Sequence, residues 1–140
     1  MRRNVFAALV TLIMAATIAV PVVNAQQTIM RCNVPFAFNI GDKQLPAGAY
    51  VVHEMDRVTL IQSKDSENSV VGIYNNAGPS KADQNKLVFD KVGDHYFLTQ
   101  IWSSARNEEL LVPESKQEKE LRASNIGPWS EVETVIVALR

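Results

Sequence analysis

Hydrophobic and polar side chains alternate over the stretch that begins at Val34. The apolar positions in this stretch are Val34, Phe36, Phe38 and Ile40. A period of two predicts a strand over residues 34–40 with one apolar face. Proline cannot donate to a sheet ladder, so Pro35 predicts an edge strand or the entry of a strand.

Short polar turns separate further apolar runs. These runs predict strands at residues 49–55, 58–61, 69–74, 86–92 and 95–103. Gly93-Asp94 is the clearest hairpin signal, because Gly comes first in a two-residue turn flanked by apolar runs. Asp56-Arg57 predicts another tight reversal. Residues 75–85 are rich in turn-forming residues and predict the longest loop.

The predicted strand 95–103 is apolar on both faces. Strict alternation places Tyr96, Leu98 and Trp102 on one face and Phe97 and Ile101 on the other. A strand of this kind is typical of the middle of a sheet, where both faces are covered.

The pattern changes near the C-terminal end. Residues 113–122 combine an early proline, acidic residues and good helix formers, which predicts a helix. Ser115 and Glu118 have the spacing of a capping box, although Pro113 leaves an earlier cap open. The charged residues predict a largely solvated helix. Residues 132–139 are β-branched and apolar enough to predict a buried strand.

About seven strands and one helix indicate a mainly β fold. An antiparallel β-sandwich and a small β-barrel both satisfy this pattern. Residues 26–140 are expected to form a single domain, because 115 residues suffice for one core.

The first 25 residues resemble a secretory signal peptide. Arg2 and Arg3 precede an uncharged apolar run that ends before Pro21, and Val23-Asn24-Ala25 has the small-residue layout of a cleavage site. We expect cleavage after Ala25, a mature chain that begins at Gln26, and a secreted or periplasmic protein. An uncleaved membrane anchor is the alternative, since the run approaches the roughly 17–25 residues that span a bilayer.

The net charge of the chain bears on which kinds of molecule it can bind. The chain has 14 basic and 15 acidic residues; removal of residues 1–25 leaves 12 against 15 and a formal charge of −3. This balance argues against nucleic acid as a partner. After removal of the signal peptide, no remaining apolar run is long enough to span a membrane. A protein or another component of the cell envelope is the expected partner.

Cys32 is the single cysteine, so the chain cannot form an internal disulfide. We expect its thiol to pack as a small apolar group at a strand start. A reactive thiol and an intermolecular disulfide are the alternatives.

The sequence contains no assembled catalytic motif. His53 and His95 each lie near carboxylates, but their spacing matches no common metal-binding or nucleophilic arrangement. We therefore predict no catalytic residues, no metal ligands and no cofactor. The candidate binding residues are Trp129, Tyr96 and His95. Trp129 lies in a Gly-Pro loop, where it would either cap the sandwich or line a ligand site.

Two strings carry a family resemblance. They are Val34-Pro35-Phe36-Ala37-Phe38-Asn39-Ile40-Gly41 with Leu45-Pro46-Ala47-Gly48-Ala49-Tyr50, and Lys86-Leu87-Val88-Phe89 with Gly93-Asp94-His95-Tyr96-Phe97-Leu98. The chain resembles, up to about Arg122, a family of small secreted bacterial proteins that is abundant in acidobacteria and has no established function. The resemblance implies an exported single domain and supplies no catalytic residues.

These observations favour a secreted, non-enzymatic binding or envelope-associated module. One alternative is a small periplasmic hydrolase that uses histidine and carboxylate side chains. Another is a barrel that carries a lipophilic ligand. Convergent polar side chains favour the hydrolase, an apolar cavity favours the carrier, and a filled core favours the binding module.

Overall fold

Most of the described chain is β-strand. The computed structural model describes residues 28–65, 70–74, 77–79, 83–124 and 132–140. The elements are β1 (Thr28–Val34), β2 (Phe38–Ile40), β3 (Lys43–Leu45), β4 (Gly48–Glu54), β5 (Val58–Ser63), β6 (Val70–Tyr74), β7 (Ala77–Pro79), β8 (Lys86–Val92), β9 (His95–Ser103), β10 (Glu108–Leu111), α2 (Lys116–Ser124) and β11 (Glu133–Ala138). The predicted signal peptide and Trp129 lie outside the described residues.

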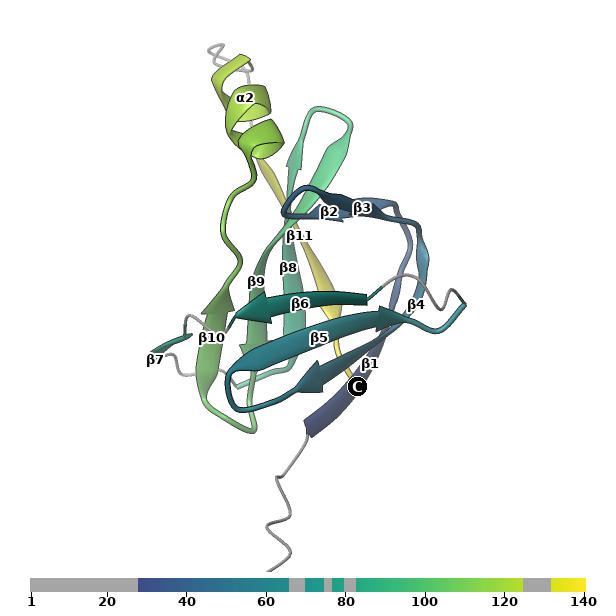
Figure 1. Cartoon of the computed structure of the whole chain (residues 1–140), viewed down its shortest axis with the longest axis vertical. Coiled ribbons are helices and arrows are strands. Elements are labelled where there is room, and N and C mark those ends of the chain that lie inside the picture. Colours follow the sequence, from purple (N-terminus) through teal and green to yellow (C-terminus); the bar gives the residue numbers. More distant parts are fainter. Residues whose placement is uncertain (1–27, 66–69, 75–76, 80–82, 125–131) are drawn as a thin grey trace, which may run out of the picture.

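The strands form two open sheets. The first sheet has the order β1-β4-β5-β6, and the second has the order β11-β8-β9-β10-β7, with β2 beside β9 and β3 beside β2. The strands of the first sheet run across those of the second (Figure 1). The prediction of a mainly β fold is therefore confirmed, and of its two forms the structure is the sandwich rather than the closed barrel.

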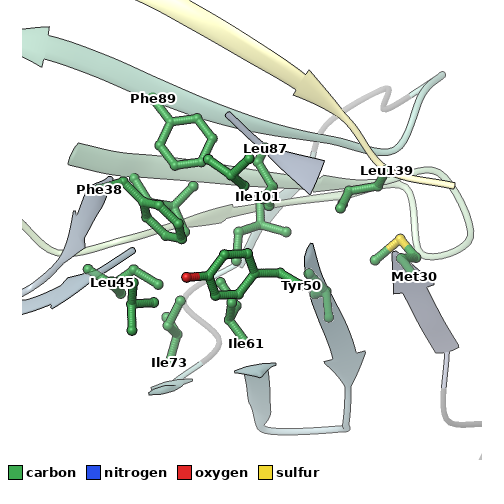
Figure 2. Close-up of a cluster of buried hydrophobic side chains, with 14 of the residues drawn as sticks. Met30, Phe38, Leu45, Tyr50, Ile61, Ile73, Leu87, Phe89, Ile101 and Leu139 are labelled. Carbon is green, nitrogen blue, oxygen red and sulfur yellow. The ribbon is translucent and has the colours of Figure 1, made fainter. Parts of the chain in front are cut away.

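The core lies between the two sheets and is filled by large apolar side chains. Both sheets contribute to it (Figure 2). Phe38 lies 5.2 Å from the ring of Tyr50 and 5.2 Å from the ring of Phe89, both in edge-to-face geometry. Because Tyr50 belongs to the first sheet and Phe38 and Phe89 to the second, these aromatic contacts join the two layers. The buried Tyr50 hydroxyl donates to the carbonyl oxygen of Pro46.

The predicted strand 34–40 is two strands rather than one. β1 ends at Val34 and β2 begins at Phe38, so the chain leaves the first sheet at Pro35 and enters the second. Val34 and Phe38 are both fully buried, which preserves the apolar period that the sequence shows. Pro35 lacks the N–H that would continue the ladder, and this explains the break.

A bulge changes the faces of β9. Val88 pairs with Gln100 but Phe89 pairs with Leu98, so Thr99 is an extra residue. Leu98 and Ile101 consequently share the core face. The prediction that put Trp102 with Leu98, and Ile101 opposite, was wrong at this point, because an inserted residue reverses the alternation. The predicted central position of β9, between β8 and β10, is confirmed.

The region from residue 75 to the helix departs from prediction in two ways. β7 lies inside the predicted long loop and pairs with β10. The helix begins at Lys116, after Ser115, whose hydroxyl accepts a 3.0 Å hydrogen bond from the backbone N–H of Glu118. Ser115 is therefore the N-cap. The prediction of a largely solvated helix is only partly right, because the Glu118 side chain is buried and 3% exposed.

The last strand, β11, is not buried as predicted. It pairs with β8 on one side only and forms an edge of the second sheet. Val135 and Val137 pack against the core, but Ile136 is 59% exposed. An apolar sequence indicates a strand, whereas its place in the sheet depends on which other segments pair with it.

Candidate functional site

The two sheets meet at one edge of the sandwich through a single pair of residues. The backbone N–H of Arg31 in β1 donates to the carbonyl oxygen of Arg140 at 2.7 Å, and the N–H of Arg140 donates back to Arg31 at 2.9 Å. β1 and β11 are not paired along the rest of their length. The two strands therefore meet beside Arg140 and then separate.

A groove opens where β1 and β11 separate. We call it the edge groove; Arg31–Asn33 line it on one side and Ile136–Ala138 on the other, with Lys64 and Arg140 at its rim. Its volume is about 630 Å³. A volume of this size lies within the roughly 300–1,000 Å³ range of known ligand sites.

The edge groove is basic at its rim and apolar along its β11 side. Arg31, Lys64 and Arg140 are exposed cations, and no acidic residue lines the groove among the described residues. Within the described part of the chain, none of these three side chains forms an ion pair. The site thus combines three exposed basic side chains with the exposed Ile136 side chain.

Cys32 lines the same groove with a protonated thiol. Burial raises the pKa of Cys32 to about 11, so at neutral pH the thiol carries its proton and is a poor nucleophile. Cys32 is half-buried and packs against the core from the middle of β1. These facts favour the packing role over the reactive one.

The two histidines that were weighed as catalytic or metal-binding residues lie in different sheets. His53 lies in β4 between the buried Val52 and Glu54, so its side chain is on the outer face of the first sheet, whereas His95 begins β9 in the second sheet. No group of three or more potential metal ligands is present among the described residues. The described histidines therefore do not form a shared centre.

The candidate binding residues His95 and Tyr96 are neighbours in β9 that face opposite sides of the sheet. Tyr96 stacks on Phe36 with ring centroids 4.0 Å apart and packs against the core. The His95 ring lies 6.3 Å from that of Phe97. Trp129 lies outside the described residues. The role of all three in binding stays a prediction.

A buried acid, Glu54, lies on the core face of β4. Glu54 is 1% exposed, and its Oε2 accepts a hydrogen bond from the hydroxyl of Ser103. Burial raises the pKa of Glu54, against the opposing effects of the Ser103 hydrogen bond and of Arg106. The alternation of Tyr50, Val52 and Glu54 along β4 was the available signal, because it places Glu54 on the core face.

A second cleft lies on the outer face of the second sheet. It has a volume of about 460 Å³, and Arg122 lies at its border. The Arg122 guanidinium contacts Asp90 at 2.7 Å, Glu118 at 2.7 Å and Glu114 at 3.3 Å. Because three carboxylates already surround this cation, it ties α2 to β8 rather than offering free charge to a ligand.

The edge groove was not predicted from the sequence. Its basic residues are more than 70 positions apart at the extremes, and nothing local to Arg31 or Arg140 indicates that they pair. The only available signal was the lack of charged, proline or glycine residues in the predicted strand after Thr134.

Among the described residues, no helix has both the length and the apolar character needed to cross a bilayer. Comparison of the chain with protein-family models, curated proteins and solved structures gives no match.

Proposed function

We propose that this protein is an exported, non-enzymatic binding module whose edge groove takes an acidic segment of another polypeptide. The observation that carries the proposal is the trio Arg31, Lys64 and Arg140 around a groove whose described lining has no acidic residue. Exposed cations at the rim of a partly apolar site favour a ligand that is acidic and has some apolar side chains. The signal-peptide pattern of residues 1–25 supports export.

The other two functions find less support. A carrier of lipophilic ligands needs space inside the fold, whereas Phe38, Tyr50, Phe89 and their neighbours fill the region between the sheets. A hydrolase needs convergent groups, whereas His53 and His95 lie in different sheets.

A labelled peptide tests the proposal directly. The probe is a fluorescein-labelled Asp-Thr-Val-Thr-Val-Thr-Asp amide, and its matched control carries Lys in place of both Asp residues. We expect fluorescence anisotropy to show binding of the acidic peptide at least tenfold tighter than that of the basic one. Raising the salt concentration from 50 to 500 mM should weaken the acidic complex, because exposed charges are screened.

Two charge-reversal variants locate the site. Lys64→Glu and Lys119→Glu make the same change in net charge, but Lys64 borders the groove and Lys119 is exposed on α2. Lys64→Glu should weaken acidic-peptide binding several-fold, and Lys119→Glu should leave it nearly unchanged. Equal binding of the two peptides, or equal losses in the two variants, would contradict the proposal.

A further inference from the structure

The free edge of β11 borders the groove, and its backbone is oriented to pair with another strand. The N–H of Leu139 donates to Asn85 on the β8 side, whereas the N–H of Arg140 donates to Arg31 on the opposite side. Backbone groups alternate in direction along a strand. The N–H and C=O groups of Thr134, Ile136 and Ala138 therefore point away from β8 toward the free edge, where no described segment pairs with them.

This edge also lacks the usual protection against strand pairing. Natural sheet edges carry lysine, proline or bulges, or are very short. Residues 134–138 are Thr-Val-Ile-Val-Ala, which contains none of these residues, and the register with β8 is continuous. By contrast, β7 at the other end of the second sheet has three residues.

We infer that the acidic segment binds as an added β-strand, antiparallel to β11 and hydrogen-bonded to Thr134, Ile136 and Ala138. This inference rests on the proposed function and specifies its mode of binding. Main-chain pairing supplies affinity in such complexes, and alternate side chains supply specificity. Antiparallel pairing matches the strand pairs β11-β8, β8-β9 and β9-β10 of the same sheet.

The register determines which ligand side chains meet the protein. A ligand residue opposite Ile136 places its side chain on the same face as Ile136, and ligand residues two positions away share that face. Arg140 is two positions after Ala138 and four after Ile136, so the same alternation places it on the Ile136 face. The preferred ligand therefore has an apolar residue opposite Ile136 and, on the same face, an acidic residue toward Arg140. The Asp-Thr-Val-Thr-Val-Thr-Asp probe meets this requirement, because its Val and Asp residues share one face.

Backbone methylation of the probe tests strand addition. N-methylation of the two Val residues removes the N–H groups that face β11, whereas N-methylation of the first and last Thr residues removes N–H groups that point away. We expect the Val-methylated peptide to bind at least tenfold more weakly than the unmodified peptide, because hydrogen bonds are lost and the methyl groups clash with β11. The Thr-methylated peptide should bind within about threefold of the unmodified one.

A pair of variants makes the same test on the protein. Ile136→Pro removes an N–H that faces the free edge and donates no hydrogen bond to β8, so the fold should tolerate it. Ile136→Ala removes the apolar side chain and keeps the N–H. We expect Ile136→Pro to weaken peptide binding at least tenfold more than Ile136→Ala does, with circular dichroism spectra that match the unsubstituted protein.

The outcomes separate the two proposals. If the unmodified acidic peptide does not bind, the proposed function fails. If it binds but the Val-methylated and Thr-methylated peptides bind equally well, the acidic ligand stands and strand addition is wrong. If Ile136→Pro instead abolishes a concentration-dependent dimer that the peptide does not displace, the edge serves self-association and the inference is overturned.

Discussion

The hydroxyl of Ser103 donates a 2.8 Å hydrogen bond to Oε2 of Glu54, and this bond joins β9 of one sheet to β4 of the other. Both residues are 1% exposed. Oε1 of Glu54 has no hydrogen-bond partner among the residues that the structure describes. Because an ionised carboxylate would carry an unsatisfied buried oxygen, burial favours the protonated form.

Glu54→Gln is expected to flatten the pH dependence of stability. A carboxyl group whose pKa is raised by folding stabilises the protein below its unfolded pKa of about 4.3, and this contribution is lost as the pH rises through the folded pKa. The unsubstituted protein should therefore lose stability as the pH rises above the unfolded pKa, and Glu54→Gln should remove that loss. Urea unfolding at pH 5 and pH 7.5 measures it.

The exposed Glu120 provides the control for this prediction. Glu120→Gln removes a carboxylate from α2 that forms an exposed ion pair with Lys116 at 3.8 Å. Its effect should be small at both pH values, since exposed pairs contribute roughly 0–1 kcal/mol. If Glu54→Gln leaves the pH dependence unchanged, Glu54 is not the group that titrates.

Gly93→Val is expected to destabilise the β8-β9 hairpin by roughly 1–3 kcal/mol. Gly93 has a φ of 61°, and Asp94 is not among the residues with positive φ. A two-residue turn with positive φ only at its first position favours glycine there. Chemical denaturation should show a lower midpoint for Gly93→Val than for the matched variant Asp94→Val. Equal midpoints for the two variants would place the strain elsewhere.

Arg122→Gln is expected to destabilise the protein by roughly 1–3 kcal/mol, because it leaves the buried Glu118 carboxylate without its cation. Arg57 is an exposed arginine in the β4-β5 turn, so Arg57→Gln should change stability by less than about 0.5 kcal/mol. Thermal unfolding compares the two. A neutral Arg122→Gln would mean that the carboxylates around it find other partners.

The histidines should contribute little to binding. We expect His53→Ala and His95→Ala to leave acidic-peptide affinity within about twofold, and a chelator to leave the melting temperature unchanged, because no described metal-ligand group includes them. A melting temperature that falls on chelation and is matched by both variants would establish a metal site and contradict the non-enzymatic proposal.

Processing is a separate prediction from residues 1–25. Intact mass spectrometry of exported protein should give a chain that begins at Gln26, because the Arg2-Arg3 start and the Val23-Asn24-Ala25 site have the layout of a cleaved signal peptide. A membrane-embedded chain that retains Met1 would support the anchor instead.

Local chemistry was enough to predict several elements. Gly93-Asp94 marks a hairpin because only its own backbone conformation and the flanking apolar runs are involved. The helix and its Ser115 cap follow for the same reason, since a cap bonds to a backbone group three residues away. The class of fold also follows, because a period of two over many short runs leaves few alternatives to packed sheets.

Tertiary structure alone decided several features that no local stretch of the sequence indicates. Thr99 has no paired residue in β8, so the side chains that follow it in β9 lie on the opposite faces from those that strict alternation predicts. The identity of Thr99 does not indicate this bulge. The alternation along β4 places Glu54 on the core face, but its hydrogen-bond donor Ser103 lies 49 positions away in the sequence. Arg31 and Arg140, which pair at the end of the edge groove, are 109 positions apart in the sequence. The edge position of β11 likewise depends on which strands pair with it. Such contacts depend on which segments meet in space, and a local hydrophobic pattern carries no information about that.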